Sequence, residues 1–212
     1  IWNGTRAGLS GACDYFGADD AFPIADIDDI LPGLLENKKR IYYSMGRYQS
    51  FDQKLINWVS QVGSMGRSGI QAPDQFLSLS RIIHEMRLYK SEAELELMRK
   101  AADISANAHL ASMKIATVGI KEYQIEAELT GAFLAEGSRS PAYPSIVGGG
   151  KNACILHYTD NNDVLRDGDL VLVDAGAEYE FYAADITRTY PVNGVFSTEQ
   201  RQIYEIVLKA QC

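Results

Sequence analysis

The sequence predicts a mixed α/β (α+β) fold in two parts, and three observations support this expectation. The chain changes character near Lys90, where short apolar runs broken by Gly, Pro and Asp give way to longer regular segments. Directly afterwards, apolar residues recur at helical spacing over about 91–116, which indicates a long amphipathic helix. Further on, the aliphatic run 170–173 is typical of a buried strand. We therefore predict two domains, 1–88 and 89–212.

The first part carries local signals of both helix and strand. Residues 41–43 follow a polar turn and predict a short buried strand. Apolar residues at helical spacing, Phe51 to Val62, predict an amphipathic helix over 52–62. The glycine-rich polar segment 62–69 predicts a loop.

The second part begins with two predicted helices. Ser91 and Glu94 form a capping box, in which each side chain can bind the other residue's backbone amide, so the long helix is expected to begin there. After Gly119, a second apolar stripe predicts another helix, with Gly137 in the position that closes helices. The stripe consists of Ile125, Leu129, Ala132 and Phe133.

A hairpin and a last helix complete the predicted order. The strand 170–173 follows a turn, and 180–192 is expected to return beside it, ending near Pro191. Ser197 and Gln200 form a second capping box and open a helix. Its apolar residues, Ile203, Ile206, Val207 and Ala210, are expected to face inward.

The composition excludes several classes of protein. Hydrophobic residues make up 46% and charged residues 23% of the chain, as in ordinary globular proteins. The formal net charge of −8 argues against a nucleic-acid partner. No apolar run approaches the roughly 20 residues of a membrane helix. Three cysteines without Cys-x-x-Cys spacing indicate reduced thiols and a cytoplasmic location. The chain begins without Met and stops inside a predicted helix, so we expect a piece of a longer protein.

Two aspartates near the predicted hairpin are the most informative polar residues. Asp174 ends the aliphatic strand, where a buried charge costs free energy unless it is paired or bound to a metal. A hairpin turn near 178–180 would place Asp185 beside it. Adjacent carboxylates repel unless a proton or cation lies between them, and hard cations such as Mn²⁺ prefer oxygen ligands. On spacing alone, however, strand-end aspartates that cap amides or pair with Arg188 are the favoured interpretation.

His157 is the third residue whose position suggests chemistry. It follows the glycine-rich turn 148–152 and the apolar residues 154–156. A histidine there is a metal ligand, a general acid or base, or a partly buried structural residue, and taken alone the structural interpretation is favoured. The triple glycine lacks the Gly-Lys-Ser/Thr ending of a phosphate-binding loop. His84, in a charged linker, and His109, beside the helix stripe, are assigned structural roles.

Three longer segments change this balance together. They are HEMRLYKSEAELELMRKA at 84–101, IVGGGKNACILHYTDN at 146–161 and DGDLVLVDAGAEYEFYAADITRTYPVNGVFSTEQRQIYEIVL at 167–208. These segments resemble the bacterial Xaa-Pro aminopeptidases (aminopeptidase P), which are pita-bread metallopeptidases. The resemblance covers nearly the whole chain. It implies that 1–88 form the later part of a creatinase/aminopeptidase P N-terminal domain and 89–212 the first half of a pita-bread catalytic domain.

The resemblance also implies a dinuclear metal site. In that family five residues hold two divalent ions, usually manganese, and two of the five are the aspartates of the VDAG and DITRT strings. These correspond here to Asp174 and Asp185, and Asp185 is assigned the bridging role. A histidine and two glutamates complete the family's set but are absent from the pattern found here. We therefore expect the 212-residue chain alone to bind metal poorly and to be inactive.

Four further residues take roles from the same resemblance. His157 is implied as the catalytic residue that lies beside the metals and contacts the scissile peptide. Thr187 is implied as a hydrogen-bonding support for the bridging carboxylate. Tyr143 matches a tyrosine that lines the substrate pocket. Trp2 resembles a tryptophan that approaches the active site of a neighbouring subunit.

The implied activity is the metal-dependent release of the N-terminal residue from peptides with proline in the second position. The implied partners are such peptides and further copies of the same chain, without nucleic acid or membrane. Two alternatives stay open. Prolidase shares the fold, metals and aspartates but cleaves Xaa-Pro dipeptides. A pita-bread domain that has lost catalysis would serve as a peptide-binding module instead.

Overall fold

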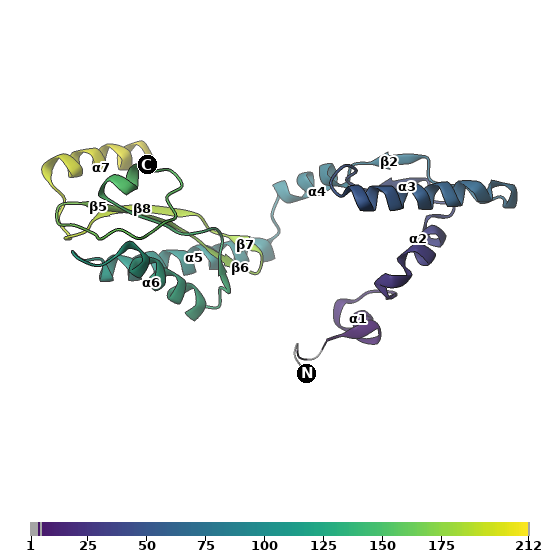
Figure 1. Ribbon diagram of the computed structural model, residues 1–212, viewed down its shortest axis with the longest axis horizontal. Helices are drawn as coiled ribbons and strands as arrows, with labels where there is room; N and C mark the ends of the chain where they lie inside the picture. Colours follow the sequence, from purple (N-terminus) through teal and green to yellow (C-terminus); the bar gives the residue numbers. More distant parts are fainter. Residues whose placement is uncertain (1–3, 5, 212) are drawn as a thin grey trace. The chain divides into compact units, whose positions relative to one another are not determined.

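The computed structural model describes residue 4 and residues 6–211 and divides into two compact units, Ile1–Tyr89 and Lys90–Cys212 (Figure 1). Both units mix helices with short strands, so the predicted mixed α/β fold is confirmed. Across the described part of the chain, no helix combines the length and apolar character needed to span a membrane.

A parallel strand pair with a helical crossover organises the first unit. Its elements are α1 (Gly8–Phe16), η1 (Ile24–Asp26), α2 (Ile27–Leu35), β1 (Arg40–Tyr42), α3 (Gln49–Ser64), η2 (Met65–Ser68), β2 (Gln75–Leu77) and α4 (Leu79–Leu88). Strand β1 pairs in parallel with β2, and parallel neighbours need a crossover, which α3 supplies. The buried residues Leu55, Trp58 and Val62 lie at helical spacing on α3. The indole Nε1 of Trp58 donates to Asp28 Oδ1 on α2 at 3.0 Å.

Three expectations for the first unit were wrong. The segment 62–69 is not a loop, because α3 continues to Ser64 and the turn η2 follows directly. Gly69, with φ of 83°, ends this helical stretch, so the glycine that forces the stop lies at the end of the segment. His84 lies in helix α4 and not in a linker. The predicted helix over 52–62 is confirmed as α3. The strand near 41–43 is present as β1, but it is not buried as expected, because its sheet has only two strands within the described residues and leaves Arg40 and Tyr42 exposed and Ile41 half-buried.

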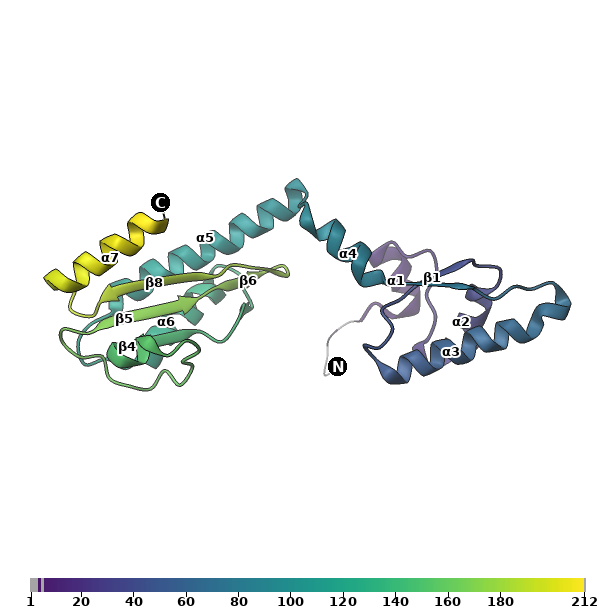
Figure 2. The same ribbon diagram turned by 90° about the horizontal axis from the view of Figure 1, so that it is seen from above.

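The second unit packs two helices against an antiparallel sheet. Its elements are α5 (Glu92–Ile115), α6 (Glu122–Ala135), β3 (Ser140–Pro141), β4 (Ile146–Gly149), η3 (Gly150–Cys154), β5 (Leu170–Ala175), β6 (Ala177–Tyr179), β7 (Tyr182–Ala183), β8 (Ile186–Pro191) and α7 (Thr198–Gln211). One sheet has the order β4-β5-β8 and the other β3-β6-β7. Helices α5 and α6 cover one face of the β4-β5-β8 sheet, and α7 lies on the other side (Figures 1 and 2).

The predicted helix boundaries of this unit are confirmed. Ser91 Oγ accepts from the amide of Glu94, whose carboxylate accepts from the amide of Ser91, so α5 begins with the expected capping box. Gly137, with φ of 96°, follows α6. The stripes of α5 and α6 meet the sheet in one core, whose largest fully buried members include Phe133, Ile104 and Ile125.

The expected returning strand 180–192 is wrong in detail, because the segment is broken at Ala184–Asp185. Strand β7 pairs with β6 in the β3-β6-β7 sheet, whereas β8 pairs with β5 in the β4-β5-β8 sheet. Gly176 lies directly against this break, and a Cβ added to it would overlap the carbonyl oxygen of Ala184. The close approach of these two backbones therefore moves the chain from one sheet to the other.

The expectation that α7 buries its apolar residues was also wrong. The second capping box is present, since Gln200 N binds Ser197 Oγ at 3.2 Å and Ser197 N binds Gln200 Oε1 at 2.8 Å. Nevertheless, α7 has no buried residue. The capping signal is local and decides where the helix begins, whereas burial depends on what packs against the helix.

Candidate metal centre

The alternating pleat of β5 decides which way Asp174 faces. Val171, Val173 and Ala175 are fully buried in the core with α5 and α6. Because successive side chains point to opposite faces of a sheet, Asp174 lies on the other face, where it is half-buried. The core is built from the aliphatic residues of this strand, and the carboxylate is left on the face toward α7.

The register of β5 and β8 brings the second aspartate to the same end of the sheet. The strands are antiparallel, with Asp174 opposite Thr187 and Ala175 opposite Ile186. Asp185 directly precedes Ile186 at the break between β7 and β8. The expected antiparallel pairing of these segments is therefore confirmed.

Tyr143 joins the two carboxylates. Its hydroxyl donates to Asp174 Oδ1 at 2.6 Å and lies 3.2 Å from Asp185 Oδ1. A tyrosine hydroxyl has one proton, so the two oxygens share a single donor. Burial raises the pKa of the Tyr143 hydroxyl, and its hydrogen bond to Asp174 raises it further. The neighbouring amide of Ala142 donates to Gly176 O at 2.8 Å, which fixes Tyr143 beside the end of β5.

The alternative that the aspartates pair with Arg188 is not what the structure shows. The guanidinium Nη1 of Arg188 donates to the backbone oxygen of Thr187 at 2.7 Å. Within residues 6–211, neither Asp174 nor Asp185 forms an ion pair with a basic side chain. The two carboxylates therefore face each other without a cationic partner from the described chain.

His109, on α5, supports the site from inside the core, and its place beside the apolar stripe is the only sequence signal for this role. It is buried, and its Nε2 donates to Ala175 O at 3.0 Å, directly after Asp174. Its Nδ1 has no hydrogen-bond partner among the described residues. Burial lowers the pKa of His109, so the ring is held in its neutral form.

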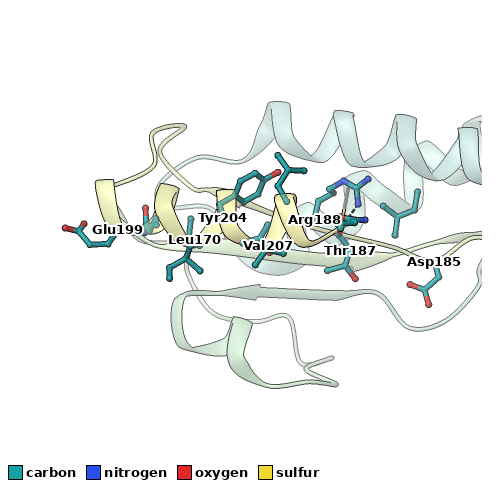
Figure 3. A pocket seen from close by; sticks show the side chains of 13 residues that line it. Leu170, Asp185, Thr187, Arg188, Glu199, Tyr204 and Val207 are labelled. Carbon is teal, nitrogen blue, oxygen red and sulfur yellow. Dashed lines mark hydrogen bonds between the residues drawn. The ribbon is translucent and has the colours of Figure 1, made fainter.

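A pocket of about 1060 Å³ lies between β8 and α7 and extends from the candidate site (Figure 3). Asp185 and Thr187 line it, and Glu199 lies at the opposite end of the view from Asp185. Thr187 is exposed, and its side chain forms no hydrogen bond with either carboxylate in the described part of the chain. The expected support of Asp185 by Thr187 stays a prediction.

The placement of His157 and Trp2 at the site stays a prediction. His157 lies in an exposed loop after η3, and no hydrogen bond links it to Asp174, Asp185 or Tyr143 among residues 6–211. Trp2 lies outside the described residues.

The donor set fits a divalent cation in part. Two carboxylates that converge on one face supply the oxygen ligands that hard cations prefer. Within the described residues, however, no group of three or more His, Cys, Asp and Glu side chains is arranged to hold a metal. This part of the chain therefore offers Asp174 and Asp185 as two ligands of a larger set.

Comparison with known proteins agrees with this geometry. Residues 96–212 match the model of metallopeptidase family M24, and residues 1–42 match the aminopeptidase P N-terminal domain. The chain is 42% identical to the Xaa-Pro aminopeptidase of Escherichia coli over 210 residues, which is 99% of this chain and 48% of that protein. It thus spans about half the length of the curated relatives it matches.

Solved structures show the same relationship. The structure of Pseudomonas aeruginosa aminopeptidase PepP superposes with a TM-score of 0.94 at 52% identity, covering 99% of this chain and 47% of that one. A zinc-substituted Escherichia coli aminopeptidase P in complex with product gives a TM-score of 0.93 at 42% identity, covering 99% and 48%. The match of the family model to more than half of the chain, including both converging aspartates, shows that the chain belongs to metallopeptidase family M24.

Proposed function

We propose that this chain serves a metal-dependent Xaa-Pro aminopeptidase, which releases the N-terminal residue from peptides with proline in the second position. The observation that carries the proposal is the convergence of Asp174 and Asp185 on one hydroxyl in a chain of family M24. The Escherichia coli relative is an Xaa-Pro aminopeptidase by name, which supports the substrate class. We assign residues 1–88 to the N-terminal domain and 89–212 to the catalytic domain.

Each residue of the site has a distinct role in this proposal. Asp174 and Asp185 would hold two divalent metal ions together with further ligands, and Asp185 would serve as the shared ligand. When bound, such ions activate a water molecule and polarise the peptide carbonyl. His157 donates a hydrogen bond to the oxygen on which charge develops. Thr187 orients the bridging carboxylate, and Tyr143 lines the substrate pocket.

The metal, the compartment and the assembly belong to the same proposal. Manganese suits an all-oxygen carboxylate pair. Cys13 and Cys154 carry free thiols, which supports a reducing compartment such as the cytoplasm. A homo-oligomer is proposed because Trp2 resembles a tryptophan that contacts a neighbouring subunit's site.

The test compares two variants of the full-length gene product. Asp185→Asn keeps the side-chain volume but removes the bridging charge, so metal content and turnover of an Xaa-Pro tripeptide should both collapse. His157→Ala leaves the ligands intact, so metal content should stay near normal while turnover falls by about 10²–10³. Elemental analysis beside peptide turnover separates the two roles. Glu199→Gln, which changes a carboxylate at the far end of the pocket, is the matched control.

The outcomes also distinguish the alternatives. If His157→Ala lost its metals as completely as Asp185→Asn, His157 would be a ligand and its catalytic role would be wrong. If both variants kept full activity, the peptidase proposal would fail. Turnover restricted to Xaa-Pro dipeptides would indicate prolidase, and peptide binding without turnover would indicate a non-catalytic module.

A further inference from the structure

Glu122 is a fully buried carboxylate that plays no part in the aspartate pair. It lies in the first turn of α6 and has 0% exposure. A buried carboxylate destabilises the fold unless its oxygens are well hydrogen-bonded, so its presence in a core needs a physical reason. The reason lies in the four donors that surround it.

All four donors come from one segment that begins with the last residue of β4. Glu122 Oε1 accepts from the amide of Gly149 at 2.8 Å and from Asn152 Nδ2 at 3.1 Å. Its Oε2 accepts from the Tyr158 hydroxyl at 2.7 Å and from the amide of Asp163 at 2.8 Å. A single carboxylate thus binds four points along residues 149–163, two of them on the backbone.

Tyr158 is held firmly as a donor in this arrangement. Burial raises the pKa of its hydroxyl, and the hydrogen bond to Glu122 adds to the rise, so the proton stays on Tyr158. Asn152 Nδ2 also lies 3.0 Å from the Tyr158 hydroxyl oxygen and 3.0 Å from Asp163 Oδ2. The two side chains that reach Glu122 therefore also contact each other.

His157 lies in the sequence between Asn152 and Tyr158, the two side chains that bind Glu122. Asn152 precedes it by five residues and Tyr158 follows it directly. Residues 154–157 are exposed, and Leu156 is 84% exposed. Within residues 6–211, the His157 side chain forms no hydrogen bond of its own. Its position is therefore set by the backbone on either side, which the buried carboxylate holds from both ends.

We propose that Glu122 is a positioning residue: its carboxylate ties Asn152 and Tyr158 together and thereby fixes the exposed loop 155–157 that presents His157. The inference rests on the proposed function for the role of His157 at the peptide. The ordering of the loop by Glu122 does not depend on that function and can be measured separately.

The direct test is hydrogen–deuterium exchange by mass spectrometry on the metal-free protein. Tyr158→Phe removes one hydrogen bond to Glu122 and keeps the ring, while Glu122→Gln removes the charge that all four donors face. Loss of one bond to a charged acceptor shifts a local opening equilibrium by about tenfold or more. Amides in 151–160 should therefore exchange about tenfold faster in Tyr158→Phe, and faster still in Glu122→Gln. Exchange in β5 should stay within about twofold of wild type.

Glu128→Gln is the matched control, because Glu128 is a half-buried carboxylate on the same helix without a hydrogen bond to this segment in the described chain. It should leave exchange in 151–160 unchanged. The proposal would be overturned if Tyr158→Phe left the exchange rate of the loop amides unchanged. It would also be overturned if exchange in the loop and in β5 rose together, because Glu122 would then be a general core residue.

Kinetics supply the second measurement. In full-length enzyme, Tyr158→Phe should lower kcat for an Xaa-Pro tripeptide by about tenfold, with metal content and KM near wild type, because only the position of His157 changes. A fall in metal content equal to the fall in kcat would overturn the positioning role. A wild-type protein without peptidase activity would instead contradict the proposed function. Faster amide exchange in the loop of the variants would still show that Glu122 orders it.

Discussion

At the scale of single residues, the aspartate pair favours metal binding but lowers the stability of the metal-free fold. Asp174 and Asp185 share one neutral donor, Tyr143, and no basic side chain of the described chain pairs with them. Two like charges that share one donor disfavour the folded protein whenever no cation is bound. The two carboxylates that offer ligands to a divalent ion are for the same reason a weak point of the metal-free fold.

In the full-length protein, this charge repulsion predicts opposite effects of Asp185→Asn with and without metal. In chelator, the variant should unfold at a temperature about 3 °C higher than wild type, because one of the two like charges is gone. With excess Mn²⁺, wild type should gain stability by mass action and the variant should gain little. Differential scanning calorimetry under both conditions measures this. A variant that is less stable than wild type in chelator would contradict the argument.

The buried ring of His109 predicts a pH dependence of stability. Burial lowers its folded-state pKa below the ordinary value of 6.5. As the pH falls below about 6.5, the unfolded chain binds a proton that the folded protein does not, so stability is complete above this pH and declines below it. Chemical denaturation at pH 7.5 and 5.5 should show the loss. His109→Gln, which keeps a donor for Ala175 O, should remove this part of the slope. An equal slope in both proteins would contradict it.

The sequence predicted only part of the candidate site at this scale. Asp174 and Asp185 stand out because strand signals surround them, although spacing alone favoured a structural interpretation. Tyr143 entered through resemblance, and nothing in its local sequence indicates that its hydroxyl lies between the two carboxylates. His109 and Glu122 gave no functional signal, because their hydrogen bonds join residues that are far apart in the chain.

At the scale of elements, local signals predicted helix starts well and the path of the hairpin poorly. The capping boxes at Ser91 and Ser197 bind only their own next turn, so their effect can be predicted without tertiary structure. The break at Ala184–Asp185 depends instead on a contact across the sheet. The burial of α7 depends on which surfaces pack against it, and the spacing of its apolar residues does not predict that.

The backbone contact at Gly176 predicts a large effect of a small substitution. A Cβ in Gly176→Ala would overlap the carbonyl oxygen of Ala184, next to Asp185, so the second unit should lose about 3 kcal/mol or more and metal affinity should fall. Gly131→Ala is the matched control, because it lies on α6 with open space around its Cβ and should gain about 0.5–1 kcal/mol. Denaturant titration checks both. An unperturbed Gly176→Ala variant would show that the close approach is dispensable.

At the scale of the whole molecule, α7 leaves an apolar surface uncovered. Ile203, Ile206 and Val207 are 63%, 63% and 62% exposed, although their spacing is that of a core-facing stripe. The pocket between α7 and β8 continues this surface. Surfaces of this kind favour association, because burying them removes apolar area from water.

The 212-residue chain should therefore self-associate through this stripe. Sedimentation velocity over a range of concentrations should show dimers or larger species for the unmodified chain. Ile206→Lys, which places a charge in the stripe, should shift the distribution toward monomer. Leu110→Lys is the matched control, since Leu110 is a 55% exposed residue on helix α5 outside the stripe and its change should leave association intact. The stripe would not be the contact if both substitutions dissociated the chain equally. If the unmodified chain stayed monomeric at high concentration, the stripe would remain exposed to solvent and the predicted self-association would be wrong.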